Sequence, residues 1–484
     1  MGYSQNGSTT ANIALERHPR GLYVLFATEM WERFGFYTML ALFTLYLRDE
    51  DEGFGWTAEQ ATSLYANYLM FVYASPLVGG FLANWKLGFR RSVMIGGVFF
   101  MAGYLLLSVP SLPVVYAALA CLVIGNGFFK PNISAMVGNL YPPGSHLKDR
   151  AYNIFYMGIN VGALLAPISA ELIRGTFGFH PAFAVAAGGM VISVAILWCF
   201  QHTVEKSDRL TPATPPADEV AQSAAVTEDT PPPDNRPAHP IEAIPDWQRI
   251  GVLVVIFLIV IVFWMVFHQN GSTMTYWANK NTDWTATENV VTSVKARVAF
   301  WDDDPQPWKM SGVVAHAINP FWVVTLTFPL IWFWRWLDGK GLEPSTPTKM
   351  AIGMFLTSVA FLVLFAAAKV GEDNATDYDG LRHAFKVSPA WLVLTYGVLT
   401  LAELMLSPMG LALVAKVSPP RHLGLMMGGW FVATAIGNKL TQIGVYWDYW
   451  MHSTFWLVLS GLAFAIAVFL LLLLRPLKKA MPGV

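Results

Sequence analysis

The sequence carries little charge for its length. Of its 484 residues only 13% are Asp, Glu, Lys or Arg, and the formal net charge is -1, whereas soluble domains usually carry about 25% charged residues. No basic surface is available to release counterions from a polyanion, so nucleic acid is not expected as a partner. Hydrophobic residues make up 55% of the chain and aromatic residues 14%. This composition predicts an all-α polytopic membrane protein.

Cysteine is nearly absent as well. Only Cys121 and Cys199 occur, both within apolar runs, which excludes a disulfide framework and a cysteine-based metal site. Residues 1–20 contain charged side chains and no apolar stretch, so no cleavable signal peptide is expected. The chain also lacks a Walker-type nucleotide-binding loop. Any transport by this chain is therefore expected to be driven by a gradient.

Long apolar runs are plentiful. A membrane span needs about 20 apolar residues, and this length recurs twelve times along the chain. Twelve transmembrane helices are therefore predicted, near residues 21–47, 57–83, 92–110, 113–137, 150–173, 181–200, 249–277, 311–334, 350–369, 389–415, 422–446 and 454–474.

A stretch rich in proline, alanine and acidic residues separates the sixth run from the seventh. It has too few large apolar side chains to offset its ordering entropy, so it is predicted to be a flexible linker. The predicted parts are a cytoplasmic N-terminal segment, an N-terminal six-helix bundle, the cytoplasmic linker, a C-terminal six-helix bundle and a cytoplasmic tail, at 1–20, 21–201, 202–247, 248–475 and 476–484.

Lys and Arg are distributed unevenly between the two sides of the membrane. With the N-terminus inside, the inner segments hold about twice as many of them as the outer segments, which favours a cytoplasmic location for both termini. The expected location is the inner, cytoplasmic membrane of the cell. Two outer connections, 278–310 and 370–388, are long and polar. They are interpreted as variable loops, with lids over a binding site as the alternative.

The stretch "TEMWERFGFY" at residues 28–37 places Glu29, Glu32 and Arg33 on one face of a spanning helix. A charge at the centre of such a helix costs about 2.5–3.5 kcal/mol, so these side chains must pair, titrate or face water. Arg33 can neutralise only one glutamate fully, and the other needs Lys130 or a proton. Since a carboxylate's protonation depends on its partner, this predicts a proton-coupled switch. A static ion network that joins two helices is the alternative.

The second half has polar residues beside Pro or Gly in its apolar runs. They are His268, His316, Asn319 and Glu403. Such interrupted helices are where transporters place their sites. His268 is singled out because Gln, Asn, Gly and Ser follow it. His316 is interpreted as structural.

Several of these stretches together resemble the proton-dependent oligopeptide transporter family of the major facilitator superfamily, in its bacterial form. "EMWERFGFY" resembles its ExxERFxYY signature, "FYMGINVGALLAP" its FYxxINxG signature and "GNGFFKPNISAMVGNLY" its fourth-helix motif. "GGFLANWKLGFRRS" resembles the superfamily loop between helices two and three, "ELMLSPMGLAL" the tenth-helix motif and "GGWFVATAIGNKL" the eleventh. The resemblance extends over nearly the whole chain.

The resemblance implies a secondary active transporter rather than an enzyme. Two six-helix bundles would open a central cavity alternately to each side and import di- and tripeptides together with protons. No cofactor is implied other than the proton as coupling ion. The expected partners are peptides, protons and the lipid bilayer, and the expected state is a monomer.

The resemblance also implies roles for individual residues. Arg33 and Lys130 would face the carboxylate of the peptide, and Glu403 its amino group. The remaining pocket positions would be Tyr37, Tyr73, Asn160, Asn319 and Trp430. Proton coupling would involve Glu29, Glu32, Arg33, Lys130 and His268.

The sequence departs from the family pattern at several points. Phe36 replaces the first tyrosine of the signature, and Asn84 replaces an aspartate in the superfamily loop. The two extra helices common in bacterial members are missing between the sixth and seventh runs. His268 stands where many members carry a carboxylate. We hypothesise that His268 titrates and, when protonated, repels Lys130; a neutral, hydrogen-bonding histidine is the alternative.

Other functions remain as alternatives to peptide symport. A relative that moves nitrate or a modified amino acid is one, although Glu403 would repel a small anion. A sensor that uses the fold without transport is another, although it would not need the two proton-handling glutamates. A membrane enzyme is the weakest alternative, because no metal cluster or catalytic triad spacing is present.

Overall fold

The protein is seen in a computed structural model, which describes residues 18–141, 147–208, 244–298, 307–375, 378–379, 382–383, 385–419 and 422–481. Before the linker, the described residues form six long helices. They are α1 (Arg20–Arg48), α2 (Ala58–Leu82, extended by the π-helical turn Ala83–Leu87), α3 (Phe89–Leu107), α4 (Leu112–Asn139), α5 (Leu147–Phe177) and α6 (Phe179–Cys199).

The second half begins with α8 (Asp246–Phe267). It continues through the 3-10 turn η5 (His268–Gly271), α9 (Thr273–Lys280), α10 (Thr285–Val298), the 3-10 helix η6 (Gly312–Ala317), α11 (Ile318–Asp338), α12 (Thr346–Asp373), α13 (Pro389–Val417), α14 (Leu423–Leu440), the 3-10 helix η8 (Thr441–Asp448) and α15 (His452–Ala480). The short strands β1 (Tyr378–Asp379) and β2 (Arg382–His383) form a hairpin between α12 and α13.

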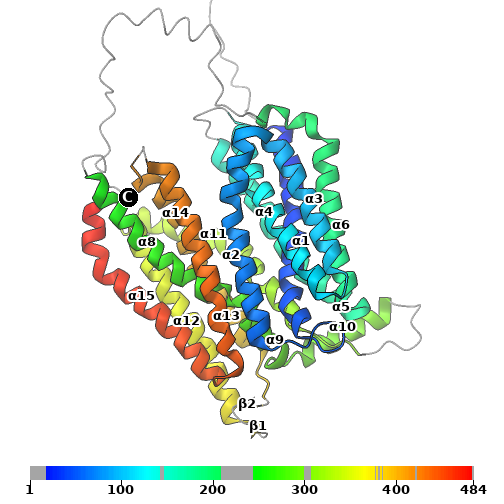
Figure 1. The fold of residues 1–484 in the computed structure, drawn as a ribbon. Helices are drawn as coiled ribbons and strands as arrows, with labels where there is room; N and C mark the ends of the chain where they lie inside the picture. Colours follow the sequence, from blue (N-terminus) through cyan, green and yellow to red (C-terminus); the bar gives the residue numbers. More distant parts are fainter. Residues whose placement is uncertain are drawn as a thin grey trace, which may run out of the picture.

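The helices gather into two groups. In Figure 1, α1 to α6, coloured blue to green, lie on one side, and α8, α12, α13, α14 and α15, coloured green to red, lie on the other. Helix α14 runs beside α2 where the groups meet. Within the described residues, ten spans are long and apolar enough to cross a membrane. Helices α1 and α14 are not among them, and they carry buried or half-buried charges instead, at Glu29, Glu32, Arg33 and Lys439.

A helix begins or continues at each of the twelve predicted runs, but the seventh run is broken. Helix α8 stops at Phe267, and the chain makes the turn η5 before α9 begins. A side chain at Gly271 would place its Cβ 1.8 Å from the hydroxyl of Tyr65. The Gly271 carbonyl accepts a hydrogen bond from Thr44 Oγ1 at 2.9 Å. The break therefore brings the second half against α1 and α2.

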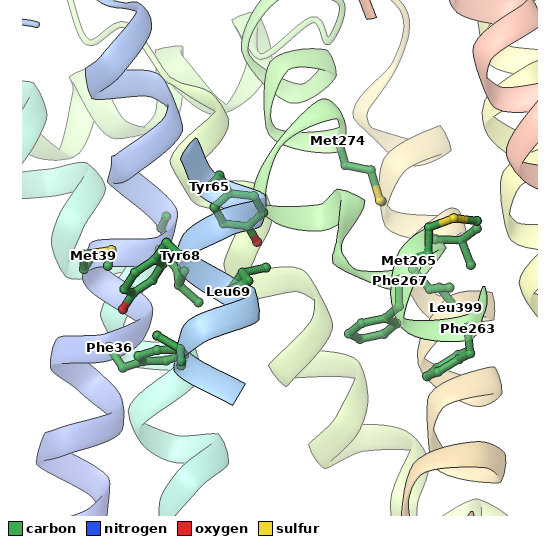
Figure 2. Close-up of a cluster of buried hydrophobic side chains, with 14 of the residues drawn as sticks. Phe36, Met39, Tyr65, Tyr68, Leu69, Phe263, Met265, Phe267, Met274 and Leu399 are labelled. Atoms are coloured by element: carbon green, nitrogen blue, oxygen red, sulfur yellow. The ribbon is translucent and has the colours of Figure 1, made fainter. Parts of the chain in front are cut away.

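Apolar side chains fill the interior of both groups. Figure 2 shows Phe36 and Met39 of α1 with Tyr68 of α2 on one side, and Phe263 of α8 with Leu399 of α13 on the other. Glycines allow helices to cross closely within the first group. A Cβ at Gly79 of α2 would lie 1.9 Å from the Gly127 carbonyl oxygen of α4, so these two backbones are in direct contact.

The connections differ in part from the prediction. The connection at 278–310, which was predicted to be a loop on the outer side, contains the helix α10. Most of the predicted linker, residues 209–243, lies outside the described residues, as do residues 1–17 and 482–484. The boundaries proposed for these segments remain predictions.

Candidate functional site

Arg33 lies between the two glutamates of α1. Its guanidinium donates to both oxygens of Glu32, with an Nη2–Oε1 distance of 2.6 Å, whereas its Nε lies 3.4 Å from Glu29 Oε1. The three side chains are at most 3% exposed. Glu29 Oε2 has no hydrogen-bond partner in the described part of the chain. Arg33 therefore neutralises Glu32 strongly and Glu29 only weakly.

The charged turn of α1 is held against α5 by a glycine. A Cβ at Gly162 would lie 2.4 Å from the Met30 carbonyl oxygen and 3.1 Å from Arg33 Cβ. No other residue fits there without moving a backbone, because such a contact is far below van der Waals distance. The glycine of "FYMGINVG" thus positions the glutamates and the arginine of "EMWERFGFY". The neighbouring Asn160, which is buried, donates from Nδ2 to the Tyr156 carbonyl of its own helix at 2.9 Å.

Lys130 of α4 contacts an aromatic ring instead of a carboxylate. Its Nζ lies 5.1 Å from the ring centroid of Tyr73 on α2. Across the described residues, no carboxylate oxygen lies within 4.0 Å of Lys130 Nζ. The ammonium is therefore available to another charge in this conformation.

His268 reaches the same tyrosine from the second half. The centroids of the Tyr73 and His268 rings are 5.6 Å apart, and Trp264 stacks on His268 at 4.9 Å with an interplanar angle of 22°. His268 is 8% exposed, and its Nδ1 has no hydrogen-bond partner in the described segments. Tyr73 thus contacts both Lys130 of the first half and His268 of the second.

Glu403 of α13 is joined to α11. Asn319 donates from Nδ2 to Glu403 Oε2 at 2.9 Å and to Thr400 Oγ1 at 2.9 Å. The same amide therefore fixes the carboxylate and ties α11 to α13. Trp430 of α14 is 6% exposed. Its ring packs on α13 at Gly410, where an added Cβ would lie 2.2 Å from the ring.

The structure thus arranges the predicted residues in three groups. Glu29, Glu32 and Arg33 form the first, with Arg33 also lying 4.6 Å over the ring of Phe36. The second is made of Lys130, Tyr73 and His268. The third comprises Asn319 and Glu403. Tyr37 is half-buried beside Phe36, at a ring distance of 5.5 Å.

A set of residues that was not predicted from the sequence joins the two halves. Glu171 of α5 accepts hydrogen bonds from the backbone N–H of Ser311, at 3.0 Å, and from its hydroxyl. Arg174 pairs with Glu171 at 3.1 Å, and the Trp308 ring occupies the space that a side chain at Gly175 would need. A sequence signal does exist, since Glu171 is an acidic residue in an apolar run with an arginine three positions later.

These contacts belong to one end of the molecule. Among the described residues, every hydrogen bond or ion pair between the two halves involves the end of α1, the start of α2 or the end of α5. They join Thr44 to Gly271, Arg48 and Ala58 to Asp448, Glu59 to Tyr449, Thr62 to Tyr276, Ser63 to Gln442, Asn67 to Lys439, Glu171 to Ser311 and Arg174 to Lys309. We call this end of the protein the joined end. The two halves are in direct contact there.

Two groups of helices held together at one end, with charged side chains inside their membrane spans, define a secondary transporter with the major facilitator superfamily fold. The sequence model of the POT family matches residues 90–226 and 309–471. The chain belongs to this family. The family resemblance predicted from the motifs is confirmed.

Relatives and solved structures agree with this assignment. An uncharacterised transporter, YclF, of Bacillus subtilis is 29% identical over 505 aligned positions, covering 96% of each chain. A di-/tripeptide transporter of Lactococcus lactis is 26% identical, covering 96% of this chain and 97% of its own. A crystal structure of a mutant of the peptide transporter POT in complex with alafosfalin has a TM-score of 0.78 at 25% identity, with 96% of each chain covered.

Proposed function

We propose that this protein imports di- and tripeptides together with protons across the cytoplasmic membrane by alternating access. Membership of the POT family supports this function. Relatives that span almost the same length are described as di-/tripeptide transporters, in Lactococcus lactis and, as a dipeptide and tripeptide permease, in Escherichia coli.

The observation that carries the proposal is that the two cations expected to bind the peptide carboxylate lie in the first half, and the acid expected to bind its amino group lies in the second. Arg33 and Lys130 lie on α1 and α4, and Glu403 lies on α13. A zwitterionic peptide fits this division, because its carboxylate would bind to the two cations and its amino group to the acid. The distance between the charges then acts as a ruler that accepts two or three residues. Tyr37, Tyr73, Asn160, Asn319 and Trp430 would hydrogen-bond to the peptide backbone or line the walls.

The proton would bind to the glutamates of α1. Glu29 is the better acceptor, because Arg33 already neutralises Glu32. Arrival of a peptide carboxylate at Arg33 and Lys130 would change the charges around both glutamates and so their protonation. His268, which contacts Tyr73 as Lys130 does, would modulate the same step. Each charge that crosses 100 mV contributes about 2.3 kcal/mol, which is enough for modest accumulation of peptide.

Both termini are proposed to lie in the cytoplasm, so that the joined end faces outward and the structure is closed to the outside. A monomer that needs no cofactor suffices for this cycle.

Uptake of labelled peptides into proteoliposomes tests the proposal. Di- and tripeptides should accumulate when a pH gradient and an inside-negative potential are imposed, and a protonophore should abolish accumulation. Uptake that is indifferent to the protonophore would refute proton symport. Uptake of tetrapeptides at the same rate as di- and tripeptides would refute the proposed limit on peptide length.

A further inference from the structure

Lys439 is a membrane-helix cation to which the site described above gives no role. It lies near the end of α14, half-buried. Its Nζ donates to Asn67 Oδ1 on α2 and to Gln442 Oε1 in η8, each at 2.5 Å. Gln442 in turn donates from Nε2 to Ser63 Oγ on α2 at 3.3 Å. The lysine therefore fastens the second half to the first, both directly and through Gln442.

The acceptors of this lysine are neutral. No carboxylate oxygen of the described residues lies within 4.0 Å of Lys439 Nζ. A charge-assisted hydrogen bond to an amide is stronger than one between neutral groups but leaves the charge without a counterion. A carboxylate at the same place would make a half-buried ion pair, which is costly to break by removing one partner. The amides thus hold the ammonium in a contact that can be broken.

The contact of Lys439 lies where the two halves must separate during transport. Ser63 and Asn67 lie on the part of α2 that faces α14 at the joined end. A transporter that works by alternating access must separate these surfaces once in each cycle. The ammonium then exchanges its amide partners for water that enters the opened cleft, so the strength of the contact bears directly on the conformational balance.

We propose that Lys439, through Asn67 and Gln442, sets the balance between the closed and the open state of the joined end. Lys439 is a positioning residue rather than part of the peptide site. The inference rests on the transport function proposed above.

Substitutions of opposite effect test this inference. Asn67→Asp supplies the missing carboxylate and should favour the closed state, whereas Lys439→Met removes the contact and should favour the open state. Lys439→Arg, which keeps the charge and the donors, should leave the balance between the closed and the open state close to that of the unsubstituted protein. Lys416→Met, at an exposed position of α13, is the matched control and should leave the balance unchanged.

The readout is the distance between spin labels at Glu50 and Asp373, both exposed at the joined end, in a background without Cys121 and Cys199. Without peptide, Asn67→Asp should increase the short-distance population and Lys439→Met the long-distance one. Proteoliposome uptake should show a maximal rate roughly tenfold lower in Asn67→Asp, with a smaller change in KM.

An unchanged distance distribution in Asn67→Asp would overturn the inference, even if Lys439→Met failed to fold. A shift of both variants in the same direction would overturn it too. The distances are measured without substrate, so the two failures can be told apart. Absence of peptide uptake by the unsubstituted protein would refute the proposed function, whereas normal uptake with unchanged distances in Asn67→Asp would refute this inference alone.

Discussion

Arg33 and Glu29 lie one helical turn apart, with 3.4 Å between Nε and Oε1, while Glu32 takes the stronger hydrogen bonds of the same guanidinium. The two glutamates of one motif are therefore unequal. One carboxylate holds the arginine in place, and the other retains an oxygen that has no partner among the described residues.

This inequality predicts different outcomes when each glutamate is replaced by glutamine. Glu32→Gln leaves the buried Arg33 without its strong partner and should lower the free energy of unfolding by about 3–5 kcal/mol. Glu29→Gln should fold nearly normally but lose proton-driven accumulation. Thermal unfolding in detergent and uptake in proteoliposomes measure the two effects. Equal destabilisation by both substitutions would contradict the assignment.

The contact of α5 with the charged turn predicts strict selection for glycine at position 162. Gly162→Ala should cost about 1–3 kcal/mol, because the added Cβ meets a backbone oxygen that cannot move freely. It should also impair uptake by displacing Arg33. Gly461→Ala is the control, since nothing lies within 4 Å of a Cβ at that position of α15. Similar melting temperatures for the two variants would argue against the close contact.

The pairing of Glu403 with Asn319 predicts recognition of the peptide amino group. Glu403→Gln should raise KM for a free dipeptide roughly ten- to hundredfold, the loss expected for one charged hydrogen bond. The same substitution should scarcely change the weak competition by an N-acetylated dipeptide, which lacks the charge. Inhibition constants for both ligands in both proteins give the comparison, and a parallel loss would point to a structural role of Glu403.

The bond between Glu171 and Ser311 predicts easier opening of the joined end once it is removed. Glu171→Gln weakens the acceptor for Ser311 and for Arg174. A cysteine introduced at Ser63, in a background without Cys121 and Cys199, should then react faster with an impermeant maleimide applied from outside. Glu343→Gln removes the partner of Lys349 within the second half and should leave the labelling rate unchanged. An unchanged rate in Glu171→Gln would show that other contacts suffice to close this end.

The contact of both His268 and Lys130 with Tyr73 predicts a role of His268 in pH dependence. If a protonated imidazole repels Lys130, His268→Gln should flatten the dependence of uptake on pH between about 5.5 and 7.5, the range in which histidine normally titrates. His316→Gln serves as control, since His316 contacts the hydroxyl of Thr275 at 2.8 Å. Unchanged uptake and pH dependence in His268→Gln would refute the switch.

The helices and the charged residues within them were predictable because the bilayer restricts both. An apolar run of spanning length has few alternatives to a helix, and a charge inside it is too costly to be incidental. Glu29, Arg33, Lys130 and Glu403 stand out on that ground from the amino-acid sequence alone.

The contacts between the halves were not predictable in the same way. Glu171 meets Ser311 across 140 positions of sequence, and no local pattern encodes such a pairing. The break after Phe267 was only half visible, because "HQNGS" signals an interruption but not that Gly271 must fit against Tyr65. The sequence left open whether the second glutamate pairs with Lys130 or takes a proton, and the contact that Lys130 makes is with the Tyr73 ring.

The glycine contact between α2 and α4 has a mechanical consequence. Because the backbone at Gly79 lies on the carbonyl of Gly127, the two helices cannot slide freely and should rock as one body. Asn67 lies on one arm of that body, and Lys130 follows Gly127 by three residues on the other helix. Separation of the halves at the joined end should therefore move Lys130 together with Asn67, without any chain of side chains to relay the motion.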